Sequence, residues 1–210
     1  MNIGQINFQN HCGRVLYSFI LQNSLKNIFE IGTWNGLGST TCVAKALSEL
    51  NSDTEFRSIE LYPEMYQEAL INLKHYSRIV RLYCGSIVKP NELNWFEDTE
   101  IDLKNDEHAK RFYKTDLENL HQSQDLNHIV PSEIDLLILD GGEYTTYPEW
   151  RKLKEKSRFI FLDDINTFKC SKICKEVLSA EHWDIIFYNN YERNGFLLCE
   201  NLNYDQKYNT

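Results

Sequence analysis

Long apolar runs are missing from this sequence of 210 residues. None approaches the roughly 18 consecutive apolar residues that a membrane-spanning helix needs. The first ten residues, MNIGQINFQN, also lack the basic flank and apolar stretch of a secretory signal. We therefore expect a soluble, cytoplasmic protein without a membrane partner.

Basic residues are in the minority. There are 22 Lys and Arg residues against 31 Asp and Glu, which gives a formal net charge of -9. This balance disfavours the broad electropositive surface that holds a nucleic acid backbone, so we expect no nucleic acid partner. We interpret the one basic cluster as a solvated helix end and loop; it comprises Arg151, Lys152, Lys154, Lys156 and Arg158.

Cysteine pairs with metal-ligand spacing are also absent. The six cysteines are scattered and form no C-x-x-C pair. Cys170 and Cys174 are four residues apart, but no histidine lies near them to complete a zinc site. Reduced, structural thiols are the better interpretation.

Short apolar runs alternate with helical patterns, which predicts βαβ units and a mostly parallel sheet. The first two helices are expected at Ser39–Leu50 and Pro63–Tyr76. The last two strands are joined by only a few residues, so they should form an antiparallel hairpin. Seven strands are predicted: Asn27–Ile31, Arg57–Leu61, Ile79–Cys84, Asp135–Asp140, Arg158–Asp163, Asp184–Tyr188 and Gly195–Glu200.

A long polar segment, Lys89–Pro131, interrupts this alternation. A structureless loop of that length would be unusual. We expect a helical insertion, with Phe112, Leu117 and Leu120 on its apolar face, that serves as a lid or a dimer contact.

The clearest local signal is EIGTWNGLGST, from Glu30 to Thr40, at the end of the first strand. Its glycines permit a tight turn and a close approach to a ligand, and the following helix start offers unpaired N–H groups. The glycine order G-x-x-x-G-x-G, with no lysine after it, matches neither the dinucleotide fingerprint nor a P-loop. The segment resembles motif I of class I methyltransferases that use S-adenosylmethionine (SAM).

The resemblance covers Asn27 to Glu200 in motif order. It implies an α/β, Rossmann-like domain over residues 1–210, with a seven-stranded sheet that is parallel except for the last strand and has helices on both faces. It also implies SAM as the cofactor, with Glu60 on the ribose and Ser86 near the adenine. The implied cofactor-binding residues are Glu30, Gly32, Thr33, Trp34, Gly36, Gly38, Ser39, Glu60, Leu61, Gly85, Ser86 and Asp140.

Carboxylates end two further strands. Asp140 follows one apolar strand, and Asp163 and Asp164 follow the next. Ligands in open α/β sheets bind at this edge, and crowded carboxylates repel one another unless a cation lies among them. Their hard oxygens suit Mg²⁺ or Mn²⁺. The arrangement is similar to the metal-dependent O-methyltransferases of the catechol and sugar types.

The resemblance implies methyl transfer to an oxygen, and we expect a sugar or glycan hydroxyl as the acceptor. Asp140 and Glu143 are the candidate catalytic residues, although many relatives carry His or Lys near position 143. A phenol or catechol acceptor and a non-catalytic SAM-binding module remain alternatives. A homodimer, or a place within a larger glycan-building polypeptide, also remains open. Ring faces for the acceptor are expected from Trp34, Tyr144, Tyr147 and Trp150, with Asn166 as a polar contact.

Overall fold

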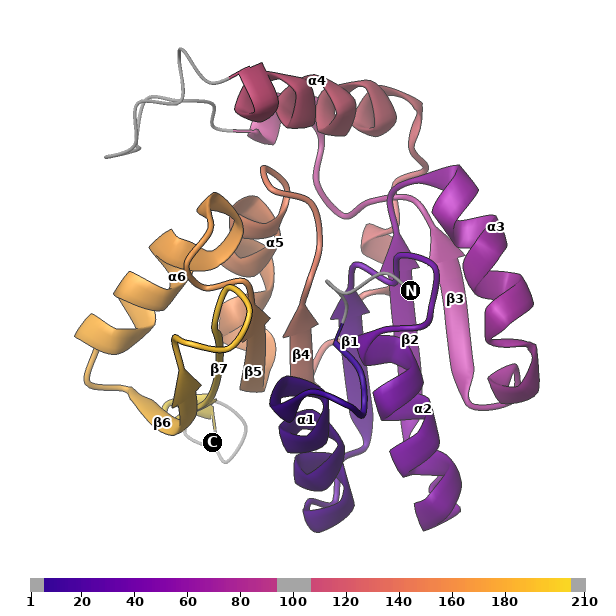
Figure 1. Ribbon diagram of the computed structural model, residues 1–210, viewed down its shortest axis with the longest axis vertical. Coiled ribbons are helices and arrows are strands. Elements are labelled where there is room, and N and C mark those ends of the chain that lie inside the picture. The colour runs from indigo at the N-terminus through magenta and orange to yellow at the C-terminus, as the bar shows by residue number, and fades with distance from the viewer. Residues whose placement is uncertain (1–5, 94–106, 205–210) are drawn as a thin grey trace.

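The computed structural model describes residues 6–93 and 107–204 of the chain. Its strands are β1 (Asn27–Ile31), β2 (Glu55–Glu60), β3 (Val80–Cys84), β4 (Ile134–Leu139), β5 (Ser157–Asp163), β6 (Trp183–Asn189) and β7 (Phe196–Asn201). They form one sheet in the order β3-β2-β1-β4-β5-β7-β6 (Figure 1). All seven predicted strands are confirmed, with ends that differ by at most two residues.

The predicted direction of the strands is also confirmed. β1 lies parallel between β2 and β4, and Ile28 pairs with Phe56 on one side and Leu136 on the other. β7 is antiparallel to both β5 and β6. The connection between β6 and β7 is too short to cross over the sheet, so the two strands form an antiparallel hairpin. In the sheet, β7 lies between β5 and β6.

In the described part of the chain, six α-helices accompany the sheet: α1 (His11–Gln22), α2 (Ser39–Leu50), α3 (Pro63–Asn72), α4 (Glu107–Gln122), α5 (Thr146–Leu153) and α6 (Phe168–Ser179). The predicted helix over Pro63–Tyr76 is split, because a 3₁₀ turn over Lys74–Tyr76 follows α3. Helix α1 is not among the elements predicted from the sequence. Its start is capped by Asn10, whose side chain accepts a hydrogen bond from the Gly13 N–H at 2.8 Å.

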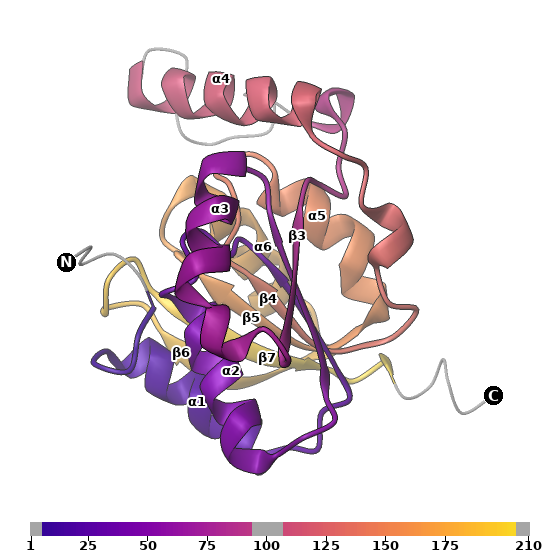
Figure 2. The same ribbon diagram turned by 90° about the vertical axis from the view of Figure 1, so that its right-hand side faces the viewer.

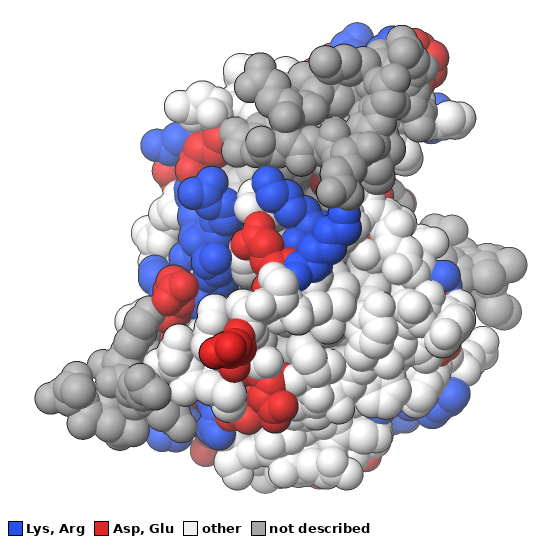
Figure 3. Space-filling view, turned by 90° about the vertical axis from the view of Figure 1, so that its left-hand side faces the viewer, with Lys and Arg blue, Asp and Glu red and all other residues white. Residues whose placement is uncertain are grey.

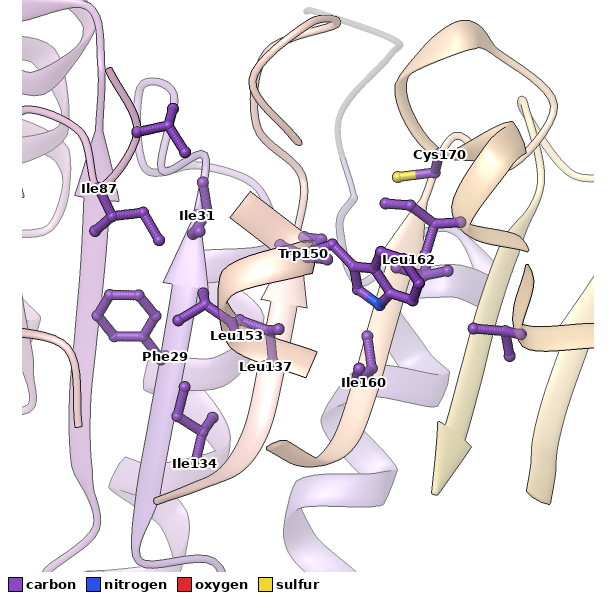
Figure 4. Close-up of a cluster of buried hydrophobic side chains, with 14 of the residues drawn as sticks. Phe29, Ile31, Ile87, Ile134, Leu137, Trp150, Leu153, Ile160, Leu162 and Cys170 are labelled. Atoms are coloured by element: carbon purple, nitrogen blue, oxygen red, sulfur yellow. The ribbon is translucent and has the colours of Figure 1, made fainter. Parts of the chain in front are cut away.

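Helices cover both faces of the sheet (Figure 2), and each face carries its own apolar core. Helices α1 and α2 pack on one face, where Leu16 and Val43 meet Ile138 and Phe161 in the same cluster. Helices α5 and α6 pack on the other face, and Figure 4 shows Trp150 of α5 beside Ile160 and Leu162. The strands β1, β4 and β5 contribute to both cores, so they read as nearly continuous apolar runs.

Helix α4 crosses the molecule above the carboxyl ends of the strands in both ribbon views (Figures 1 and 2). It belongs to the predicted insertion Lys89–Pro131, of which residues 94–106 lie outside the described part of the chain. The predicted helix through Phe112, Leu117 and Leu120 is confirmed, with Leu120 buried. Within the described residues, no helix has the length and apolarity to cross a membrane.

Candidate active site

The ends of β1, β2 and β4 come together at Gly32. Its N–H donates to the Ile59 carbonyl at 3.0 Å, and the Asp140 N–H donates to the Ile31 carbonyl at 2.9 Å. Gly32 has a φ of +97°, and a Cβ at this position would lie 2.1 Å from the Asp140 carbonyl oxygen. Only glycine fits here, because a side chain would push the two loops apart.

A pocket opens where these strands end. Seven of the residues predicted from the sequence line it: Gly32, Trp34, Glu60, Leu61, Gly85, Asp140 and Glu143. Its remaining walls include Tyr62, Phe112 and Glu149. The predicted meeting of Gly32, Glu60 and Asp140 at one pocket is therefore present in the structure.

Glu60 is held rigidly at the end of β2. One carboxylate oxygen accepts the Trp34 N–H at 2.6 Å and the other accepts the Tyr62 N–H at 2.8 Å. Burial raises the pKa of Glu60 to about 7, although these hydrogen bonds act in the opposite direction. The backbone N–H of Leu61 also stabilises this carboxylate. A carboxylate has about four lone-pair sites, so acceptor capacity remains for a ribose hydroxyl. The geometry fits the role that the resemblance implies.

Glu30 lies behind the pocket rather than in its wall. It is fully buried, and one of its oxygens accepts hydrogen bonds from Thr40 at 2.7 Å and Ser58 at 2.5 Å. These contacts join the start of α2 to β2. Burial raises the pKa of Glu30 to about 7. Its other oxygen has no hydrogen-bond partner among the described residues. A cofactor contact of Glu30 stays a prediction.

The remaining predicted cofactor residues shape the loops around the pocket. Thr33 and Ser58 share a hydrogen bond at 2.5 Å between their hydroxyls. The Ser86 hydroxyl accepts the Val88 N–H at 3.1 Å. Residues outside the pocket wall are Thr33, Gly36, Gly38, Ser39 and Ser86, and their contact with a cofactor stays a prediction.

The three predicted metal-ligand residues do converge. Carboxylate oxygens of Asp140, Asp163 and Asp164 lie within 4.8 Å of one another. Two cations accompany them. The Lys169 ammonium lies 2.7 Å from Asp140 Oδ1 and 2.8 Å from Asp164 Oδ2. The Arg193 guanidinium lies 3.1 Å from Asp163 Oδ2.

This arrangement does not fit a divalent metal ion. Mg²⁺ binds carboxylate oxygens at about 2.0–2.1 Å, so the ion must occupy the space between those oxygens. The Lys169 ammonium fills that space between Asp140 and Asp164. Burial by itself lowers the pKa of Lys169, but the three aspartates raise it well above its usual value, so the side chain stays charged. The predicted convergence of Asp140, Asp163 and Asp164 is therefore present, but the prediction did not include the Lys169 ammonium beside them.

Glu143, the second candidate catalytic residue, lines the pocket next to this charged group. Its carboxylate accepts the backbone N–H of Lys169 at 2.9 Å. Burial raises the pKa of Glu143 above its ordinary value. A carboxylate with a raised pKa is a better proton acceptor, so Glu143 suits a general base.

Only one of the predicted aromatic contacts lines the pocket. Trp34 is 41% exposed at the rim. Tyr144 and Trp150 are buried in the core, and the Tyr147 hydroxyl donates to Glu176 at 2.6 Å. The expectation of ring faces from Tyr144 and Trp150 is wrong. Trp150 lies on the face of α5 that packs in the core, and the buried Tyr144 donates its hydroxyl to the Ala109 carbonyl at 3.0 Å. Asn166 is exposed and donates to the Asn190 carbonyl at 2.9 Å.

Helix α4 is tied to the rim of the pocket through Asp116. This buried carboxylate accepts a hydrogen bond from the Tyr62 hydroxyl and another from the Tyr144 N–H at 3.1 Å. Phe112, one turn earlier on α4, lines the pocket itself. The sequence contained one signal for Asp116, since it lies four residues before Leu120 on the buried face of the helix.

Three further charged residues of this region were not predicted from the sequence. Lys169 follows the start of α6, and Arg193 lies in the turn between β6 and β7. Glu149 of α5 lines the pocket and is buried, which raises its pKa to about 8. No local motif marks any of them, because each reaches the site only through packing of distant elements.

The basic cluster near α5 is largely occupied by contacts within the chain. Lys152 lies 2.8 Å from Glu92, and Arg158 lies 3.0 Å from Glu200. The Lys154 ammonium lies 4.1 Å from the centre of the Trp150 ring. Figure 3 shows Lys and Arg side chains interspersed with Asp and Glu on the side of the molecule that carries α6. These pairs agree with the interpretation of a helix end and loop.

No protein-family model matches the sequence, and comparison with curated proteins also finds no match. Solved structures do resemble the chain. An O-methyltransferase from Bacillus cereus in complex with S-adenosylhomocysteine (SAH) is 13% identical, with a TM-score of 0.60 over 94% of this chain and 83% of the other. A methyltransferase from Geobacter sulfurreducens is 12% identical, with a TM-score of 0.59 over 96% and 83%.

A third similar structure is the O-methyltransferase TomG from Streptomyces achromogenes, involved in tomaymycin synthesis and solved in complex with SAM. It is 15% identical, with a TM-score of 0.56 over 90% of this chain and 78% of the other. At these identities the likeness concerns the fold. The order and direction of the strands, the glycine loop after β1 and the matching structures lead to one conclusion. This chain has the fold of the class I SAM-dependent O-methyltransferases.

Proposed function

We propose that this protein is a SAM-dependent O-methyltransferase whose acceptor is a hydroxyl of a sugar or glycan. One observation carries the proposal: Gly32, Glu60 and Asp140 end neighbouring parallel strands and line one pocket. A glycine loop, a carboxylate for a ribose and a carboxylate at the reaction end are then present in the order that the cofactor requires.

SAM would lie with its ribose at Glu60, its adenine near Leu61 and Gly85, and its amino acid end near the glycine loop after β1. When bound, it supplies a methyl group on a positively charged sulfur. Trp34 and Phe112 also line this pocket and are themselves partly exposed. The protein contributes mainly alignment, because an in-line displacement depends on the relative position of acceptor oxygen, methyl carbon and sulfur.

The chain must also remove a proton from the acceptor. The new O–C bond forms as the C–S bond breaks, the electron pair of that bond goes to sulfur, and the hydroxyl proton passes to a carboxylate. Glu143 and Asp140 both line the pocket at this end. We assign the base to Glu143, because Asp140 is engaged by Lys169 at 2.7 Å.

The carboxylates that line the pocket support a sugar or polyol acceptor, although most of the remaining lining is apolar. Carboxylates accept hydrogen bonds from hydroxyl groups, and Asp140, Glu143 and Glu149 all line the same wall. A phenol or catechol acceptor is an alternative that the apolar part of the lining favours, since Trp34, Leu61 and Phe112 also line the pocket. A non-catalytic SAM-binding module is the remaining alternative.

Two measurements test the proposal. Calorimetry should detect binding of SAM and SAH by the purified protein, with no binding of ATP as the matched nucleotide control. Incubation with methyl-labelled SAM and a panel of glycans and phenols, followed by mass spectrometry, should give labelled methyl ethers of a glycan. Labelled phenols would move the assignment to the phenol acceptor. Binding without transfer to any acceptor would favour the non-catalytic module, and absence of binding would refute the proposal.

A further inference from the structure

The position of Lys169 has a consequence for the chemistry of the site. Its ammonium lies within hydrogen-bond distance of two of the three clustered aspartates, and its side chain is only 6% exposed. The residue is fixed at both ends, because its backbone N–H donates to Glu143 at 2.9 Å. The ammonium is therefore a built part of the site rather than a surface charge that happens to lie near it.

Arg193 supplies a second cation to the same cluster. Its guanidinium donates to both oxygens of Asp163, at 3.1 and 3.4 Å, and lies 3.8 Å from Asp164. Each of the three carboxylates thus has a cationic partner within the chain. Lys169 and Arg193 together carry the same formal charge as a single divalent ion.

We propose that Lys169 and Arg193 replace the divalent metal ion at this site, so that the protein holds Asp140, Asp163 and Asp164 together with its own cations. This inference rests on the proposed function, since it concerns how the same site is neutralised. Lys169 is a positioning residue in this account. It holds Asp140 at the pocket wall and reduces the electrostatic repulsion between the clustered carboxylates.

A divalent ion and Lys169 compete for the same oxygens. A metal that entered would have to displace the ammonium from Asp140 and Asp164. The displaced side chain would then stay buried beside a doubly charged cation, and an uncompensated buried charge is strongly unfavourable. Removing the positive charge of Lys169 should therefore create a metal site from the carboxylates that remain.

Binding of Mn²⁺, followed by electron paramagnetic resonance, tests this without cofactor or acceptor. In a titration, the wild-type protein should leave the signal of free Mn²⁺ unchanged. The Lys169→Met variant should bind one equivalent of Mn²⁺, which lowers the signal of free Mn²⁺. Adding Asp164→Asn to this variant should abolish the binding and return the signal to the wild-type level. The matched control is Lys175→Met, an exposed position on the same helix, which should behave as the wild type. Circular dichroism would establish that each variant is folded.

Two outcomes would overturn the inference. One is a wild-type protein that binds Mn²⁺ and loses it on Asp164→Asn. The other is a folded Lys169→Met variant that binds none. If Lys169→Met does not fold, the wild-type titration alone still tests the inference, because binding of Mn²⁺ that Asp164→Asn abolishes would contradict it. Since the titration measures metal binding alone, its result is independent of whether the protein transfers a methyl group.

An activity measurement supplies a second line of evidence once an acceptor is known. Methyl transfer by the wild type should be unchanged in EDTA, and Mg²⁺ or Mn²⁺ should not increase it. A loss of transfer in EDTA that Mg²⁺ restores would contradict the replacement of the metal by Lys169. Failure to find any acceptor would weaken the proposed function but leave the Mn²⁺ result standing.

Discussion

Asp116 of helix α4 accepts a hydrogen bond from the hydroxyl of Tyr62, which follows β2. Its second oxygen accepts the backbone N–H of Tyr144, which follows β4. One buried carboxylate thus connects the insertion to two loops at the rim of the pocket. It acts beside the hydrogen bond from the Tyr144 hydroxyl to the Ala109 carbonyl of α4, at 3.0 Å.

Asp116→Ala should release α4 from the rim. Loss of a carboxylate that satisfies two buried donors should cost about 1–3 kcal/mol of local stability, because the donors are left unpaired. Hydrogen exchange should become faster over Glu107–Gln122 and change little in the sheet. Glu118→Ala, an exposed position on the same helix, is the control. Equal exchange in Asp116→Ala and the wild type would show that this contact does not hold α4.

Glu60→Gln should weaken cofactor binding. The amide keeps the shape of the side chain but loses the charge and one acceptor, so SAH should bind more weakly by about 1–3 kcal/mol. Calorimetry measures the difference. Glu64→Gln, an exposed position at the start of α3, should leave the affinity unchanged. A normal affinity in folded Glu60→Gln would show that the ribose assignment is wrong.

Gly32→Ala should destabilise the protein and impair the pocket. The φ of +97° is unfavourable for alanine, and its Cβ would meet the Asp140 carbonyl at 2.1 Å. The loops must separate to relieve this contact. We expect a lower melting temperature and loss of SAH binding, measured by calorimetry. The exposed Leu37→Ala in the same loop should have little effect on either. A Gly32→Ala variant with the stability of the wild type would contradict the close approach of β1 and β4.

Glu30 should make stability depend on pH. Burial raises its pKa in the folded state to about 7, from an ordinary value of 4.5. The folded protein therefore holds this proton more tightly than the unfolded chain does. The contribution is fully present below the unfolded pKa and is lost as pH rises through about 7, with a total on the order of 3 kcal/mol.

The Glu30→Gln variant isolates this contribution. Urea unfolding of both proteins between about pH 4 and pH 8 should show the free energy of unfolding falling with pH more steeply in the wild type than in the variant. Glutamine cannot ionise, so it removes the cost of a buried charge at high pH. Parallel curves for the two proteins would show that Glu30 has an ordinary pKa in the fold.

The sequence by itself determined the sheet. Runs such as Ile134–Leu139 are apolar enough to be buried on both faces, and the short link after β6 permits only a hairpin. The glycine loop and the Glu60 carboxylate could also be predicted from the sequence, because each is a local feature at the end of a strand. The cofactor pocket follows from these elements, since parallel strands deliver their carboxyl ends to one edge.

Only the tertiary structure decided how the aspartates are neutralised and how α4 is held. Lys169 and Arg193 meet Asp140, Asp163 and Asp164 from separate elements, so no spacing along the chain marks them as partners. The same holds for Asp116 and Tyr62. Local sequence patterns report which face of a helix or strand is buried. Pairing of charges across elements depends on packing, which those patterns do not encode.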